Sequence, residues 1–158
     1  METSVAAQYP GETTTSTELL QLADEYRVAA QALEKLGRAG VPFSRSPYRL
    51  NAIHAIELYL NVLLLHAGHD GGWIRGLSHD LAARAELAVQ YGLTLRRRTQ
   101  AHLQTLADTR EYLVSRYAPE RSAGLSQLNR LSATLDEIAV KVGAIVRSPL
   151  RTAKLARP

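Results

Sequence analysis

Two charged residues occupy positions where a helical bundle normally has apolar side chains. Apolar residues recur every three or four positions along two long segments, and one of these stripes contains Glu57 and the other Arg110. A buried charge must be paired and hydrogen-bonded, because its desolvation is otherwise costly. We therefore predict that Glu57 and Arg110 face the interior and share a network with His54, one turn before Glu57. Such a network either fixes helix register or forms part of a site.

A second group combines a histidine with arginines. Arg96 and Arg97 stand six and five residues before His102. An imidazole can act as general base and a guanidinium can stabilise a phosphorane-like transition state, so this group is a candidate for RNA cleavage without a metal. With sixteen arginines and five histidines in the chain, this spacing is also expected by chance.

Metal and cofactor sites have weaker signals. His66 and His69 flank Gly68, and Asp70 adjoins them, but no third and fourth ligand is evident. Cysteine is absent, which excludes thiolate sites and cysteine nucleophiles, and no phosphate-binding loop or nucleophile elbow is present. We predict neither a metal centre nor a cofactor.

The elements that must position these residues are helices. One begins after a cap at Ser16 or Thr17 and ends before Gly37, and the others span about 47–66, 78–91, 94–117 and 121–146. The third is predicted to have Ser78 as its cap. The 47–66 segment is apolar almost all round, which is typical of a central helix. The sequence predicts an all-α fold, an up-and-down helical bundle of four to five helices.

The length of 158 residues fits one domain. We expect residues 1–15 to form a disordered lead, residues 16–146 the bundle, and residues 147–158 a flexible tail with four cations and no acid. No signal sequence is visible, and the apolar run at 58–65 is too short to span a membrane. These features predict a cytoplasmic protein without a membrane partner.

The charge is unevenly distributed along the chain. The formal net charge is +4, but residues 47–158 carry fifteen basic and nine acidic side chains, a balance of +6. Sixteen of the 19 basic residues are arginine, whose guanidinium binds phosphate through a fork of donors. This favours a nucleotide or RNA partner. The alternative is a solvated charged surface from a genome that favours arginine and alanine.

Three short motifs occur in a fixed order. The first runs from His54 through Glu57 to Leu60, the second is Leu-Ser-His-Asp-Leu at 77–81, and the third is Arg-Tyr-Ala-Pro at 116–119. Together they resemble the HEPN domain over about residues 16–146. The resemblance implies an α-helical bundle, usually dimeric, in a superfamily of RNase toxins, nucleotide-binding partners of nucleotidyltransferases and catalytically silent members. The motifs and stripes together give a candidate ligand-binding or buried polar network of His54, Glu57, His79, Arg110 and Arg116.

The chain departs from the pattern that the resemblance implies. Asn61 stands where a lysine is expected, and neither Arg110 nor Arg116 is followed by a histidine five to seven positions later. We therefore expect a non-catalytic homodimer that binds a nucleotide, RNA or a protein such as a nucleotidyltransferase or an antitoxin. One alternative is a toxin-type RNase with His102 and Arg96 or Arg97 in a composite site across the dimer. Another is a purely structural interaction module.

Overall fold

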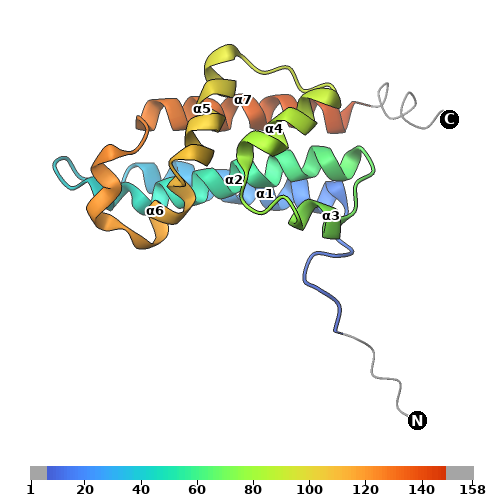
Figure 1. Cartoon of the computed structure of the whole chain (residues 1–158), viewed down its shortest axis with the longest axis horizontal. Coiled ribbons are helices and arrows are strands. Elements are labelled where there is room, and N and C mark those ends of the chain that lie inside the picture. Colours follow the sequence, from blue (N-terminus) through green and yellow to red (C-terminus); the bar gives the residue numbers. More distant parts are fainter. Residues whose placement is uncertain (1–6, 149–158) are drawn as a thin grey trace, which may run out of the picture.

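The computed structural model describes residues 7–148, and within this range the chain is helical with no strand (Figure 1). The all-α prediction is confirmed. In chain order the elements are α1 (Ser16–Glu34), the 3-10 helix η1 (Pro42–Arg45), α2 (Ser46–His66), α3 (Gly71–Arg75), α4 (Leu81–Gln90), α5 (Arg97–Asp108), α6 (Glu111–Tyr117), the 3-10 helix η2 (Pro119–Gly124) and α7 (Leu128–Arg147). Three of them, α1, α2 and α7, are long, and none of the described helices has the length and hydrophobicity to cross a membrane.

The central helix is α2, as the sequence predicts. It packs against α1, α7, α6 and α4, and residues on all its sides are buried (Figure 1). Its two buried tyrosines have polar partners on the long neighbours: Tyr59 donates to Asp24 of α1 at 2.6 Å, and the Tyr48 and Ser132 hydroxyls lie 2.5 Å apart. A buried phenol without such a partner would be costly. These contacts fix α2 between α1 and α7.

Several helix ends differ from the prediction. The cap of α1 is Thr15, which forms a capping box with Glu18, rather than Ser16 or Thr17. The cap of α4 is Asp80, because Ser78 has a left-handed backbone with φ 51°. The predicted helix from 121 begins only at Leu128, since η2 occupies the preceding segment. The glycine-rich loop contains the short helix α3.

The predicted helix over 94–117 is wrong, because the chain breaks between α5 and α6. Arg110 adopts the left-handed conformation, with φ 52° and ψ 43°, and its side chain is exposed. The break rotates the residues after it, so that Glu111 and not Arg110 is buried. The expectation that Arg110 faces the interior is therefore also wrong.

Glu111 pairs with an arginine of the central helix. Arg49 Nη1 donates to Glu111 Oε1 at 2.5 Å, and Arg49 Nη2 donates to the Ser126 carbonyl at 2.7 Å. The Ser126 hydroxyl donates to the other Glu111 oxygen at 2.9 Å. Both charged side chains are buried, so this network joins α2, α6 and the segment before α7 away from water.

The two ends of the chain lie partly outside the described residues, which exclude 1–6 and 149–158. Of the predicted lead, the structure describes residues 7–15. In this segment the Glu12 backbone N–H donates to the Tyr9 carbonyl in a turn, and the Arg75 guanidinium lies 3.9 Å from the Tyr9 ring centre. The predicted basic tail lies outside the described residues from 149 onward.

We expect Glu111→Gln to lower the free energy of unfolding by about 3 kcal/mol or more, because it leaves the buried Arg49 charge uncompensated. Asp136→Asn is the matched control, since it breaks the solvent-accessible ion pair of Arg27 and Asp136 and should cost less than about 1 kcal/mol. Urea unfolding of both variants measures the difference. Equal losses would contradict the importance of the buried pair.

Candidate functional site

Glu57 has two partners at the face where α2 meets α4, a histidine and an arginine. Its Oε2 lies 3.1 Å from His79 Nδ1, and its Oε1 lies 3.5 Å from Arg84 Nη2. The predicted network around Glu57 therefore exists, but its guanidinium comes from α4 and not from Arg110. His79 immediately precedes the α4 cap, so the start of that helix sets its position.

Arg84 holds this face together from within. Its side chain is only 2% exposed, and its Nε donates to Asn61 Oδ1 at 2.7 Å. The remaining guanidinium donors reach the carbonyl oxygens of Ile74, Leu77 and Asp80 at 3.4 Å. Burial lowers the pKa of Arg84, and the Glu57 and Asp80 carboxylates oppose that effect. Asn61, which stands where the resemblance implies a lysine, thus binds a cation supplied by another helix.

His54 and Arg116 extend the cluster along α2 and α6. The His54 ring contacts Tyr26 edge to face at 4.4 Å. Burial lowers the pKa of His54; Glu57 opposes this, and the nearby positive charge of Arg116 adds to it. The His79 ring lies 4.8 Å from the Tyr112 ring, one turn before Arg116 on α6. We call His54, Glu57, His79, Arg84, Tyr112 and Arg116 the polar cluster.

Two cavities adjoin the polar cluster. One, of about 340 Å³, includes His54, Glu57 and Asn61 in its lining, and residues Tyr9–Gly11 form part of its wall. The other, of about 390 Å³, includes His79, Arg110 and Tyr112, and we call it the His79 cavity. The Glu57 to His79 contact joins the walls of the two.

The backbone of the His79 cavity is strained. Ser78 and Arg110, the two non-glycine residues with positive φ among residues 7–148, both line it. Such conformations cost about 1–3 kcal/mol each and cluster at functional sites. The cavity also contains Asp80, Glu86 and Asp108, so its charge is mixed.

The alternative catalytic group is not brought together on an accessible surface. His102 is 5% exposed and its Nδ1 lies 2.7 Å from the Thr134 hydroxyl, while Arg96 and Arg97 are exposed at the start of α5. Burial, with Arg130 and Arg49 adding to it, lowers the pKa of His102 to about 4. The buried neutral ring sits among the side chains that join α5 to α7.

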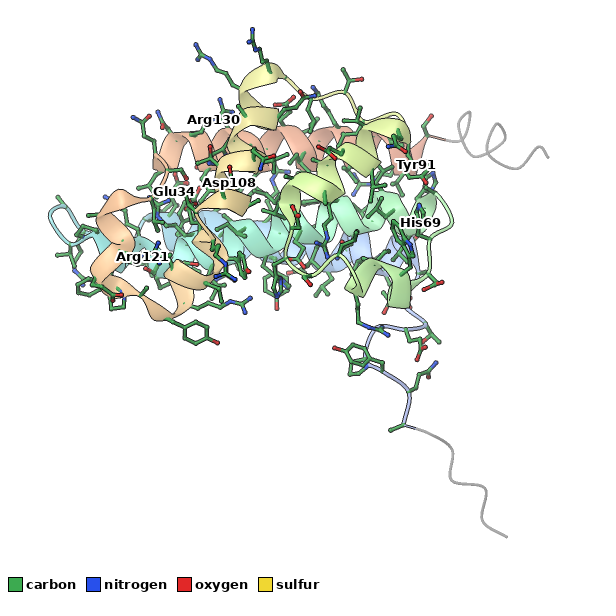
Figure 2. The ribbon with its side chains drawn as sticks, in the orientation of Figure 1. Glu34, His69, Tyr91, Asp108, Arg121 and Arg130 are labelled. Atoms are coloured by element: carbon green, nitrogen blue, oxygen red, sulfur yellow. The ribbon has the colours of Figure 1, made fainter. Side chains whose placement is uncertain are left out.

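His69 of the glycine-rich loop has other partners, whereas Nε2 of His66 is buried without a hydrogen-bond partner among the described residues. His69 Nε2 lies 2.6 Å from the Tyr91 hydroxyl (Figure 2). The His69 ring also stacks on Trp73, with the ring centres 4.0 Å apart. Asp70 accepts a hydrogen bond from Trp73 N and caps α3. Between residues 7 and 148 no three histidine or acidic side chains converge as metal ligands.

The sequence interpretation missed Arg84, although a signal for it was present. Arg84 lies on the stripe of Leu81, Ala85 and Ala88 that α4 buries, at the same spacing used to find Glu57. Arg49 carried the same kind of signal, since it stands on α2 at this spacing from the buried Ala52, Ile53 and Ile56. Glu111 had none, because the break at Arg110 decides its orientation.

Comparisons with models of protein families, with curated proteins and with solved structures find no match. The resemblance to the HEPN domain therefore stays a prediction from the motifs. The geometry of the polar cluster and of its cavities is the ground for a functional proposal.

The lowered pKa of His102 predicts acid sensitivity. The unfolded chain takes up a proton near pH 6.5 and the folded chain only near pH 4, so stability falls as the pH drops through this window. The loss from this group is roughly 3 kcal/mol when complete. Chemical unfolding between about pH 7 and pH 4 should therefore show a shallower pH dependence for His102→Gln than for the unchanged protein. Parallel curves would contradict a buried, neutral His102.

Proposed function

We propose that this chain is a non-catalytic, HEPN-like helical domain that binds a nucleotide or single-stranded RNA at the α6 side of the polar cluster. One observation carries the proposal. Tyr112 stands between Arg110 and Arg116 on α6, both arginines are exposed, and neither forms an ion pair with a described residue.

The charges around these two arginines leave them available. Glu57 is already paired with Arg84 and His79, and Asp108 accepts a hydrogen bond from Gln104 at 2.8 Å. Asp80 accepts from the Ala83 backbone as the α4 cap. The guanidiniums of Arg110 and Arg116 therefore keep their donors for an anion that arrives from solvent.

The aromatic rings next to these arginines are placed to stack with the base of a nucleotide. Tyr117, next to Arg116, is 75% exposed, and Tyr112 lines the His79 cavity. Bases stack on aromatic rings with little regard to sequence, while arginines follow the phosphates. The combination supports a single-stranded ligand without strong base specificity.

The non-catalytic part of the proposal rests on His102. A general base must reach the proton that it removes and must be able to hold it near the working pH. His102 is buried, its pKa is near 4, and the exposed Arg96 and Arg97 do not share its surroundings. This is poor support for the composite RNase site.

A second candidate function has an observation of its own. The Glu57 carboxylate favours the proton of His79 on Nδ1, which leaves Nε2 of this residue as a base, and His79 and Arg110 both line the His79 cavity. Such a base could take the proton of an RNA 2′-hydroxyl, whose oxygen then attacks the adjacent phosphorus and expels the 5′-oxygen. The expelled oxygen takes a proton from water, and a 2′,3′-cyclic phosphate is left. Arg110 would stabilise the charge of the transition state.

The remaining expectations follow from the resemblance and from the sequence. They are a homodimer, a nucleotidyltransferase or antitoxin as protein partner, and a cytoplasmic location. A purely structural module is the reading that applies if no RNA or nucleotide binds.

The test is incubation of the protein with labelled single-stranded RNA without metal, following retention and cleavage together. We expect intact, retained RNA, and Arg116→Gln should weaken binding by about 3-fold to 10-fold and reduce the salt dependence by about one phosphate contact. Arg97→Gln, which removes an exposed arginine from α5, is the matched control and should leave binding nearly unchanged.

Cleavage decides between the two candidates. If RNA is cut and His79→Gln abolishes cutting while His102→Ala does not, the second candidate replaces the first. If cutting depends on His102, the composite RNase is correct and the structure-based proposal is wrong. Absence of any binding leaves the structural module.

A further inference from the structure

A cavity of about 270 Å³ is lined by the loop that joins α1 to α2 and by the helix η2. These two segments lie at the left end of the ribbon in Figure 1. Three arginines line it, Arg38, Arg45 and Arg49, and none of its described lining residues is acidic. We call it the arginine pocket. It is separate in its lining from the polar cluster and from both of that cluster's cavities.

Two buried polar atoms of this pocket have no hydrogen-bond partner among the described residues. They are the hydroxyl of Ser122, which is 4% exposed, and Nε of Arg49, which is 6% exposed. An unsatisfied buried donor costs about 1–3 kcal/mol, so native proteins rarely keep one without a partner. Both atoms belong to residues that line the same cavity, and a bound acceptor would satisfy them together.

The charge of the pocket points to the kind of acceptor. Glu111 neutralises Arg49, but neither Arg38 nor Arg45 forms an ion pair with a described residue. Two positive charges are thus left uncompensated, and they match a phosphomonoester, which carries about −1.5 to −2 at neutral pH. Its oxygens also fit the donor forks of guanidiniums.

Local contacts position the Arg45 side chain and the backbone of Arg38 before any ligand arrives. The Arg45 side chain lies across Gly37, where an added Cβ would come within 2.6 Å of Arg45 Nη1 and 2.8 Å of its Cγ. The Ser44 hydroxyl accepts from the Arg38 backbone at 2.8 Å and donates to the Val41 carbonyl at 2.6 Å. The loop is therefore shaped around Arg38 and Arg45.

We propose that the arginine pocket binds a terminal phosphate group, through the guanidiniums of Arg38 and Arg45, the Nε of Arg49 and the hydroxyl of Ser122. The source of that group is free phosphate or the 5′-phosphate of a nucleotide or RNA. The second source rests on the proposed function, whereas the first does not.

The primary test is calorimetric titration of the full chain with inorganic phosphate. We expect one site of millimolar or tighter affinity, weakened by about 10-fold in Arg45→Gln. Ser122→Ala should weaken it by about 3-fold, the effect of one lost donor. Gly37→Ala should also weaken it, because the added methyl displaces Arg45 while the net charge stays the same. Arg121→Gln removes an exposed charge beside Ser122 without altering the pocket lining, so it should bind phosphate normally.

The outcomes distinguish phosphate binding in the arginine pocket from general attraction by the positive surface charge. Absence of phosphate binding overturns the proposal. So does equal weakening in Arg121→Gln and Arg45→Gln, or normal binding in Gly37→Ala and Ser122→Ala together, because each would show that charge alone attracts the anion.

A second arm distinguishes the two sources of phosphate. RNA with a 5′-phosphate and RNA with a 5′-hydroxyl are compared on the unchanged protein and on Arg45→Gln. A preference for the 5′-phosphate that Arg45→Gln removes identifies an RNA or nucleotide end, and equal binding of both RNAs identifies free phosphate. Arg116→Gln should weaken the binding of both RNAs and leave the binding of inorganic phosphate unaffected. The proposed function can therefore fail in this test while phosphate binding by the arginine pocket is still observed.

Discussion

The buried ion pair of Arg49 and Glu111 determines much of the architecture at one end of the protein. The carboxylate can reach Arg49 only because the chain leaves the helical path at Arg110, which separates α5 from α6. The same arginine holds the Ser126 carbonyl, and Ser126 in turn holds Glu111. The pair thereby fixes the chain after η2 against α2. Its desolvation is tolerable because the carboxylate and most of the guanidinium donors are satisfied.

A second buried arginine plays a corresponding role on α4. Arg84 donates hydrogen bonds to carbonyl oxygens of the segment before α4, and it also binds Glu57 and Asn61 on α2. The turn that it holds carries His79, so the geometry of the Glu57 to His79 contact depends on a side chain that solvent hardly reaches. Two buried polar networks, one around Arg49 and one around Arg84, thus connect the apolar central helix to its neighbours. Each network has candidate functional residues next to it at the surface.

The networks of Arg84 and Arg49 differ in whether they leave a hydrogen-bond donor without a partner. Around Arg84 each nitrogen of the guanidinium has a partner, so the buried group itself has no donor left for a ligand. The groups that remain available to a ligand there are His79, Arg110 and Arg116. Around Arg49 the Nε donor has no hydrogen-bond partner among the described residues, and Arg49 lines a cavity with two further arginines. An anion bound there would complete the coordination of a residue that already supports the fold. Ligand binding and stability would therefore be linked at this end of the molecule.

The sequence by itself determined the helical class, the central position of α2 and the presence of a polar network at Glu57. Periodicity and hydrophobicity are local properties, and the nearly continuous apolar run of α2 is strong enough to define a central helix. Tertiary structure decided the rest. The left-handed conformation of Arg110 has no signature in the local sequence, yet it exchanged Arg110 for Glu111 in the interior. The choice of Arg84 as the partner of Glu57, and the meeting of Arg38, Arg45 and Ser122, likewise depend on which helices pack together, because residues distant in the chain become neighbours only when the core forms.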